Sequence, residues 1–160
     1  MYKLKNFKSK NKVFLFKLYN QSILEKKFYK NNTISLDEHK NWLKQNLIKR
    51  NVIIYIFYYN KKEIGYSRFS KHRKFTYSVS IALIEKYRNK GLGNKLLELS
   101  LKNFFRKNKG QVFAYIKNKN SKSINIFKKN NFVKISKKVF YIKTGKNIFL
   151  KNFSFLVYKK

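Results

Sequence analysis

Two glycines stand between a run of β-forming residues and a helix-like pattern of leucines, and this junction constrains the fold most. The segment YRNKGLGNKLL, residues 87–97, places Gly91 and Gly93 two positions apart, after Arg88. Before it lies YSVSIALI, residues 77–84, which is rich in β-branched and aromatic residues and predicts a strand. After it, apolar residues recur at the spacing of a buried helical stripe: Leu96, Leu97, Leu101, Phe104 and Phe105. The junction therefore predicts a strand, a loop and a helix in that order.

A glycine-containing loop at a helix start has a specific chemical use. Backbone N–H groups in the first turn lack partners within the helix, and the helix dipole adds positive potential there. Glycines let a ligand approach those groups closely, so such a loop can bind phosphate; a tight turn alone explains an isolated pair equally well. The spacing is not that of a Walker loop, and G-x-G-x-x-G fails because Leu96 stands where the third glycine belongs.

The first half of the chain predicts strands and one clear helix. Residues 2–7 are expected to form a strand, while residues 13–20 fit either a strand or a helix capped by Ser9 or Asn11. Ser35 and Glu38 form an S-x-x-E capping box at the start of a helix over 35–49. Two β-rich runs then flank the turn-like residues 60–63 within 51–70, which predicts a hairpin.

The second half alternates strands and helices. The helix after the glycine junction is expected to end before Gly110, and a strand follows at 111–116. A short helix is expected within 120–130, capped by Asn120 or Ser121, and two further strands over 132–143 and 147–158. The fold class is therefore α+β (mixed α/β), a sheet with helices packed on it, within one domain spanning residues 1–160.

Composition excludes several classes of protein. Hydrophobic residues make up 43% and aromatic residues 18% of the chain, which argues against global disorder. No apolar run approaches the ~20 residues that span a bilayer, and the first residues lack the apolar core of a secretory signal, so we expect a cytoplasmic protein. With no cysteine and only His39 and His72 as histidines, we expect no metal site.

The formal net charge of +34 admits two interpretations. A strongly basic chain can bind a polyanion, and nucleic acid is the obvious partner. However, lysines greatly outnumber arginines, are spread along the whole chain, and accompany other residues with AT-rich codons, so genomic base bias explains them as well. We expect nucleic acid to be an unlikely partner, although the charge can still attract an anionic small ligand.

A second motif gives the glycine junction a family context. Asn120, Ser123, Phe127 and Phe132 fit N-x-x-S-x-x-x-(aromatic)-x-x-x-x-F, one strand after R-x-x-G-x-G. Together these motifs resemble the GNAT superfamily of acetyl-CoA-dependent N-acetyltransferases. The resemblance implies a mostly antiparallel, twisted sheet that splays between its fourth and fifth strands, with helices on both faces. It also implies acetyl-CoA as co-substrate and no metal.

The resemblance assigns cofactor-binding residues. The backbone of the glycine loop is expected to hold the pyrophosphate of coenzyme A with Arg88 alongside, and the splayed fourth strand to hold the pantetheine arm and the acetyl carbonyl. The full set is Ile81, Ala82, Leu83, Arg88, Asn89, Lys90, Gly91, Leu92, Gly93, Asn94, Asn120 and Phe127.

The acceptor is less constrained. The segments LKNF, residues 4–7, YNQSILEKKFYKNNTISLDEH, residues 19–39, and HKNW, residues 39–42, look like the GNAT branch that acetylates amino groups of nucleotide-linked sugars. In that interpretation His39 and Trp42 face the acceptor, a small-molecule amine, and Arg68 contacts it. The buried stripe of an amphipathic helix explains His39 and Trp42 equally well, and Arg68 fits an ordinary solvated strand residue equally well. A ribosomal-protein type of N-terminal acetyltransferase and a noncatalytic nucleic-acid-binding protein are the alternatives. We expect no membrane partner. The oligomeric state can be a monomer or a homodimer.

The catalytic residues depart from the family pattern. In this superfamily a tyrosine at the position of Phe127 often protonates the departing thiolate, and phenylalanine has no proton to give. Some relatives carry a glutamate base where this chain has Tyr115. His39, Tyr115 or a chain of waters could serve as the base, and the sequence does not decide among them. A relative that binds acetyl-CoA with impaired catalysis is a further alternative.

Overall fold

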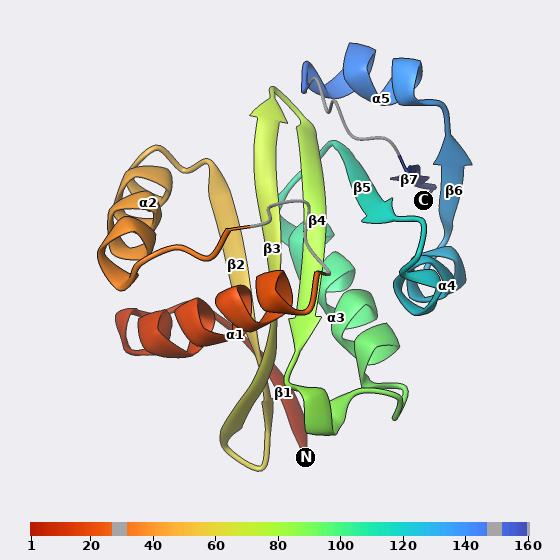
Figure 1. Cartoon of the computed structure of the whole chain (residues 1–160). Coiled ribbons are helices and arrows are strands. Elements are labelled where there is room, and N and C mark those ends of the chain that lie inside the picture. The colour runs from red at the N-terminus through yellow and green to blue at the C-terminus, as the bar shows by residue number, and fades with distance from the viewer. Residues whose placement is uncertain (27–31, 147–151, 160) are drawn as a thin grey trace.

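A seven-stranded sheet organises the chain (Figure 1). The computed structural model describes residues 1–26, 32–146 and 152–159. The strands follow the spatial order β1-β2-β3-β4-β5-β7-β6. β4 and β5 run parallel, and the other neighbouring pairs run antiparallel. The strands are β1 Tyr2–Asn6, β2 Val52–Tyr59, β3 Lys62–Arg73, β4 Thr76–Leu83, β5 Gln111–Lys117, β6 Phe132–Ile135 and β7 Phe153–Tyr158.

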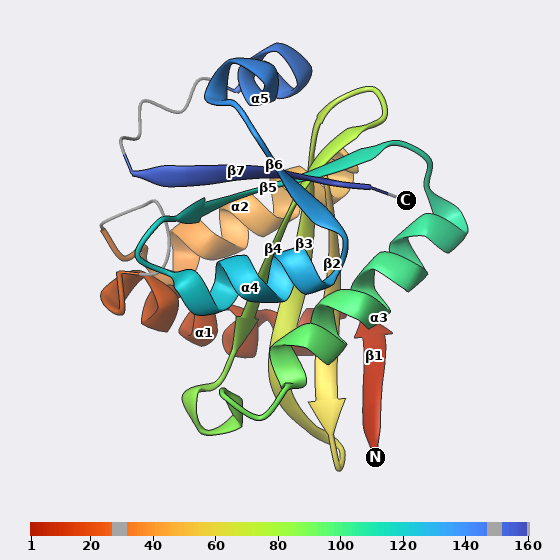
Figure 2. The same ribbon diagram turned by 90° about the vertical axis from the view of Figure 1, so that its right-hand side faces the viewer.

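Helices cover both faces of the sheet (Figure 2). α1 and α2 lie on one face, α3 and α4 on the other, and α5 packs beyond the first pair against β5 and β7. The predicted fold class is confirmed. The helices are α1 Lys12–Leu24, α2 Leu36–Ile48, α3 Leu92–Lys107, α4 Ser121–Lys129 and α5 Lys137–Thr144, with short 3-10 turns at Ser9–Asn11 and Glu85–Tyr87.

Side chains alternate between the two faces of the central strands, so the hydrophobic core has two layers, one on each face of the sheet. On β2, Ile54 and Ile56 pack beneath α1 and α2, whereas Tyr55 faces α3. On the α3 face, the rings of Phe69 and Phe104 stack with centroids 4.3 Å apart. Each large apolar side chain that is fully buried in these layers contributes ~1.5–3 kcal/mol of transfer free energy. Both layers hold β3 and β4 rigidly, and the functional cleft opens beside them.

The sheet opens between β4 and β5, as predicted. Their parallel ladder contains three pairs, Thr76 with Gln111, Tyr77 with Val112 and Ser78 with Phe113. After Ser78 the two strands continue without further pairing among the described residues. Backbone groups on the facing edges of 79–83 and 114–117 are therefore available to a ligand, since buried backbone groups need hydrogen-bond partners.

Local signals explain several elements. Residues 13–20 are helical, and Asn11 occupies the N-cap position of α1. Its side chain makes no capping hydrogen bond to that helix and accepts instead from the Lys8 N–H at 2.8 Å. The capping box of α2 is present, because the Glu38 N–H donates to Ser35 Oγ at 3.2 Å and Glu38 accepts from the Ser35 N–H at 2.6 Å. The β2–β3 hairpin turns at Asn60 and Lys61, both with positive φ.

The predicted strand over 132–143 is wrong in its second half. β6 ends at Ile135, and Ser136 caps α5 by accepting from the Val139 N–H at 3.2 Å. Phe140 anchors that helix in a buried cluster with Phe113 and Phe155, and Gly145 ends it with φ of 67°. The capping serine and the terminal glycine override the β-like composition of the segment. Within the predicted strand at 147–158, β7 occupies Phe153–Tyr158, and residues 147–151 lie outside the described chain.

Candidate functional site

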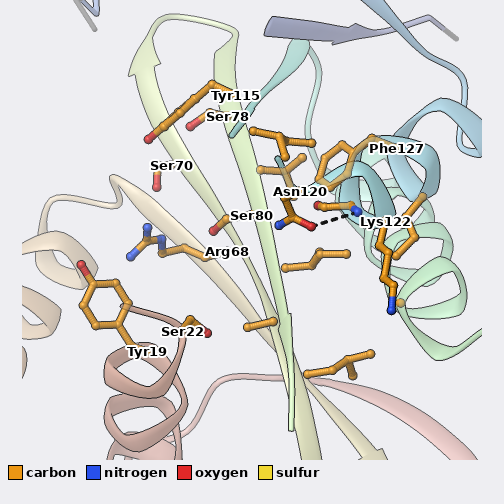
Figure 3. Close-up of a pocket in the computed structure, with 18 of the residues that line it drawn as sticks. Tyr19, Ser22, Arg68, Ser70, Ser78, Ser80, Tyr115, Asn120, Lys122 and Phe127 are labelled. Atoms are coloured by element: carbon orange, nitrogen blue, oxygen red, sulfur yellow. Dashed lines mark hydrogen bonds between the residues drawn. The ribbon is translucent and has the colours of Figure 1, made fainter. Parts of the chain in front are cut away.

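A cleft of ≈ 1370 Å³ occupies the gap between β4 and β5 and continues beneath α1 and α2 (Figure 3). Small-molecule pockets typically measure roughly 300–1,000 Å³, so this cleft has room for more than one small ligand. One half is built by the end of β4, the start of α3 and α4. We call it the α3–α4 half. The other, the α1–α2 half, is built by α1, α2, β3 and the side chains that β4 and β5 direct toward them.

The glycine loop shapes the far end of the α3–α4 half. Gly91 precedes the first turn of α3 with φ of 73°, and its carbonyl accepts from the Asn94 N–H at 3.1 Å. A Cβ at this position would meet no atom within 4 Å, so a side chain would not be crowded there. Glycine is favoured because the backbone is left-handed at this position. Asn89 also has positive φ, of 59°. The helix start therefore presents N–H groups beside open space, an arrangement suited to an anion.

Gly93 has a different structural reason. It is buried two residues further along, in the first turn of α3, and a Cβ there would stand 2.8 Å from Ile126 Cδ1 and 3.8 Å from Leu83 Cδ1. The missing side chain therefore lets α3 approach α4 and the end of β4. The two glycines of the motif serve two purposes, one conformational and one of packing.

Arg88 links the loop to α1. Its Nε donates to the Leu83 carbonyl at 2.9 Å, and its guanidinium forms an ion pair with Glu25 at 2.7 Å. Both side chains are largely buried, 20% and 23% exposed. The arginine of the motif thus holds the end of β4 and the last turn of α1 together at the rim of the cleft.

The start of α4 closes the same half. Asn120 Oδ1 accepts from the Ser123 N–H at 3.2 Å and caps the helix (Figure 3). Lys122 Nζ donates to Asn89 Oδ1 at 2.9 Å. Phe127 lines the cleft with its ring edge-on to Phe132, the centroids 4.9 Å apart. Position 127 therefore contributes an apolar wall.

Arg68 dominates the α1–α2 half. Its guanidinium carbon lies 5.1 Å from the Trp42 ring and 5.9 Å from the Tyr19 ring. It stands opposite Ser80 in the β3–β4 register, and Figure 3 shows both on the side of the sheet that faces α1. Within the described part of the chain, Arg68 Nε and Ser80 Oγ are buried without a hydrogen-bond partner. A buried guanidinium nitrogen and a buried hydroxyl in this state can accommodate a polar ligand group.

His39 lies in an aromatic surround. Its ring contacts those of Phe16, Tyr19 and Trp42, and 3% of the residue is exposed. Burial, with the charge of Arg68 adding to it, lowers the pKa of His39 to about 4. The imidazole is therefore neutral at pH 7 and a weak proton acceptor.

Tyr115 lies where β4 and β5 separate. Lys146 Nζ donates to its hydroxyl oxygen at 2.8 Å, and its ring packs against Phe140 with centroids 5.6 Å apart. Burial raises the pKa of Tyr115, and the charge of Arg68 opposes that shift. Nearby, His72 Nε2 and Ser78 Oγ lie 2.8 Å apart.

The structure brings nearly all predicted site residues to this one cleft. Two lie outside its lining: the Lys90 side chain is exposed, and the Leu92 side chain packs with Phe57, Ile64 and Leu83. The others line it: His39, Trp42, Arg68, Ile81, Ala82, Leu83, Arg88, Asn89, Gly91, Gly93, Asn94, Tyr115, Asn120 and Phe127.

Sequence reasoning missed other lining residues. Tyr19 and Ser22 come from α1, and Lys146 follows α5, so folding alone brings them close. Ser78 and Ser80 carried a usable signal, because two serines at alternate positions of a buried strand must share a face. That face opens into the cleft.

No cluster of three or more His, Asp or Glu side chains capable of holding a metal occurs among residues 1–26, 32–146 and 152–159. Within the same ranges, no helix has the length and apolar character needed to cross a membrane.

Comparisons with known proteins agree with this architecture. The family model described as an acetyltransferase (GNAT) domain matches residues 4–133. No curated protein sequence matches the chain significantly.

Solved structures share the fold at low sequence identity. Spermidine N-acetyltransferase from Vibrio cholerae, solved with CoA and spermine, has a TM-score of 0.81 at 13% identity over 98% of this chain and 94% of that one. Ribosomal-protein-alanine N-acetyltransferase from Brucella melitensis has a TM-score of 0.79 at 15% identity, covering 97% and 98%. A phosphinothricin acetyltransferase from Sinorhizobium meliloti, solved with acetyl-CoA, has a TM-score of 0.78 at 20% identity, covering 98% and 86%. At such identities the likeness concerns the fold.

Proposed function

Since this chain belongs to the GNAT acetyltransferase domain family, we propose that it moves the acetyl group of acetyl-CoA onto a primary amine of a nucleotide-linked amino sugar. Acetyl-CoA-dependent N-acetyl transfer is the reaction of the family; the acceptor is our proposal. The observation that carries it is Arg68, whose buried Nε lacks a partner within the described residues while its guanidinium lies between two aromatic rings in the cleft.

The α3–α4 half fits coenzyme A. N–H groups at the start of α3, beside the open space at Gly91, would hold the pyrophosphate through the backbone of residues 89–94. The unpaired edge of β4 at Ile81–Leu83 would bind the amides of the pantetheine arm, as a neighbouring strand would. Asn120 and Phe127 flank that path. Acetyl-CoA supplies the activated acetyl thioester.

The α1–α2 half fits an anionic acceptor. Arg68, Lys71 and Lys146 line it, and guanidinium groups recognise phosphate oxygens in a bidentate manner. Trp42 and Tyr19 offer flat faces for a sugar or a base. A diphosphate would be drawn to these cations, and the net charge of +34 would strengthen the attraction over longer distances.

The required chemistry can be met largely by this chain's backbone. Direct transfer needs a neutral amine, a polarised thioester carbonyl and a proton for the departing thiolate. N–H groups that β4 directs into the gap can polarise the carbonyl, so no particular side chain is required for that role. The neutral imidazole of His39 is a weak proton acceptor, so we assign the deprotonation of the amine to water.

Two other functions remain as alternatives. An amino-terminal peptide acceptor, of the ribosomal-protein type, would use the same cleft, and an acidic peptide would be attracted by the same cations. A nucleic-acid-binding role would rest on the lysine surface and would weaken steeply as salt is raised.

A coupled thiol-release assay distinguishes the acceptors. Purified protein and acetyl-CoA are incubated with UDP-linked 4-amino-sugars, with peptides bearing free N-termini, and with spermidine. We expect turnover on at least one amino sugar and none on spermidine, whose positive charges the cleft repels. Turnover on peptides alone would overturn the proposed acceptor and leave acetyl transfer intact.

The nucleic-acid alternative is tested separately by thermal unfolding. Ligands that bind only the folded state raise the melting temperature. We expect micromolar coenzyme A to raise the melting temperature. This increase should depend less on salt concentration than any increase caused by DNA. If DNA raised the melting temperature at low salt and coenzyme A did not raise it at all, the nucleic-acid-binding function would be favoured.

A further inference from the structure

Position 127 places a phenylalanine beside the coenzyme A path, so the proton for the departing thiolate must come from elsewhere. We propose that Tyr115, reaching the gap from β5, is the catalytic acid that protonates the sulfur of coenzyme A. The proposal rests on acetyl transfer itself and is independent of the acceptor's identity.

The strand register places Tyr115 at the narrow end of the gap. Ser78 and Phe113 form the last pair of the β4–β5 ladder. Two residues further along each parallel strand come Ser80 and Tyr115, so these two face each other across the point where the strands begin to separate. Figure 3 shows the Tyr115 hydroxyl on the same side of the sheet as Ser70, Ser78 and Ser80. A thioester bound along β4 would bring its reacting atoms to this end of the gap.

Phe127 and Tyr115 approach the gap from opposite faces. Phe127 packs in the core cluster of the α3–α4 side with Ala114 and Ile116, whereas Tyr115 points to the α5 side, where it packs around Phe140. A phenol at either position would approach a sulfur atom held between the strands from one face of the sheet. This chain carries its phenol on the β5 side.

The neighbours of Tyr115 suit an acid. Phe140 and Phe153 hold its ring, with centroids 5.6 and 6.5 Å away. Lys146 Nζ donates to the phenol oxygen at 2.8 Å, so the phenol's own hydrogen takes no part in that bond. After the proton is transferred, the phenolate would face the ammonium group of Lys146, with the Arg68 guanidinium as the second nearby cation.

Its protonation state agrees with that role. Burial raises the pKa of Tyr115, so the side chain carries its proton at neutral pH, as an acid must and a base must not. The proton balance closes without another reactant. The amine nitrogen forms a bond to the acetyl carbon as the carbon–sulfur bond breaks, and the sulfur keeps the electron pair. Sulfur takes the Tyr115 proton, and the phenolate regains one, through water, from the acetylated nitrogen.

The test replaces Tyr115 and then restores a phenol on the other face of the gap. Thiol release from acetyl-CoA is measured with hydroxylamine as a small general nucleophile, so the natural acceptor is not needed. We expect Tyr115→Phe to lower kcat about 10- to 100-fold with the KM for acetyl-CoA within about twofold. The double variant Tyr115→Phe with Phe127→Tyr should recover most of the loss. Tyr141→Phe, at an exposed position of α5, is the matched control and should match wild type.

A second measurement does not depend on turnover. The thiolate of bound coenzyme A is followed by its ultraviolet absorbance during a pH titration of each variant. A hydrogen bond from Tyr115 stabilises the thiolate, so Tyr115→Phe should raise the pKa of the bound thiol and the double variant should lower it again. An unchanged thiol pKa in Tyr115→Phe would overturn the proposal, and so would a kcat equal to that of wild type.

Discussion

The two halves of the cleft are built by different means. In the α3–α4 half, the expected ligand contacts come from the backbone of one continuous junction, from the end of β4 to the first turn of α3. In the α1–α2 half, the contacts are side chains from distant segments, with Tyr19 on α1, Trp42 on α2, Arg68 on β3 and Lys146 after α5. A backbone site tolerates changes of side chain that preserve its geometry, whereas a side-chain site changes its ligand with single substitutions.

This difference explains how one fold can serve many acceptors. We expect backbone N–H groups with a left-handed glycine to bind the cofactor in this chain, a role that leaves the acceptor side free to vary. The spermidine, ribosomal-protein-alanine and phosphinothricin acetyltransferases share this fold, and the acceptors in their names differ widely in charge. We therefore expect substitutions in the two halves to separate cleanly into effects on coenzyme A and effects on the acceptor.

The largest effect is expected at Gly91. Gly91→Glu forces a side chain into a left-handed conformation and sets a carboxylate against the pyrophosphate, which should weaken coenzyme A binding about 100-fold. Calorimetric titration measures it.

Gly91→Ala is the matched control. It carries the same backbone strain of ~1–2 kcal/mol but adds no charge, and its Cβ has open space. Its melting temperature should fall while its affinity for coenzyme A stays within a few-fold of wild type. Equal affinity in Gly91→Glu and wild type would remove the pyrophosphate from this loop.

A pH dependence of the free energy of unfolding is expected from His39 and His72. The pKa of His39 and that of His72 are each lowered to about 4, mainly by burial, with Arg68 adding to the first shift and Lys146 to the second. The unfolded chain therefore binds more protons between about pH 6.5 and 4. Stability is complete above that window and falls as the pH drops through it, by on the order of 1–3 kcal/mol per histidine.

Urea unfolding at pH 7 and pH 4.5 measures this loss. His39→Gln should reduce the difference between the two pH values, and Lys143→Gln, at an exposed site on α5, should leave it unchanged. An undiminished pH dependence in His39→Gln would mean that the imidazole is protonated in the folded state.

A smaller effect is expected at Arg68. Arg68→Lys keeps the charge and loses the planar fork that lies between Trp42 and Tyr19, so the KM for an anionic acceptor should rise about tenfold, ~1.4 kcal/mol. The KM for acetyl-CoA should stay the same, since Arg68 belongs to the other half. Steady-state kinetics with each substrate varied in turn measures both. A parallel rise in both constants would show that the halves are not separable.

The smallest effect is expected at Phe127. With Tyr115 in place, Phe127→Tyr should leave kcat equal or slightly raised, since a second phenol adds little to an existing acid. Phe127 is 2% exposed, so the melting temperature of the variant is measured alongside its activity. A large loss of activity without a loss of stability would assign Phe127 a role as an indispensable apolar wall.

Sequence reasoning succeeded where local signals dominate. The capping box at Ser35, the turn at Asn60 and the glycine junction each fix backbone geometry within a few residues, so the helices, hairpin and loop follow from them. The splay between β4 and β5 was expected from the family resemblance and not from any local pattern, and the three-pair ladder confirms it.

One local signal was missed, and contacts between distant segments could not be predicted. The strand expected through residues 136–143 followed β-like composition over the capping Ser136, whereas the contacts of α5 and Lys146 with Tyr115 join segments far apart in the chain. The pairing of Arg88 with Glu25 and the stacking of Arg68 on Trp42 likewise depend on how α1 and α2 dock. No spacing in the sequence encodes such docking, so the side-chain half of the cleft could be predicted only in part.

The most direct test of this division is a crystal structure of the protein with coenzyme A bound. We expect the pyrophosphate at the N–H groups of residues 91–94 and the pantetheine arm along Ile81–Leu83 in the gap beside β5. The space around Arg68 and Trp42 should stay clear of the cofactor. Coenzyme A bound with its diphosphate on Arg68, or outside the gap, would contradict the account.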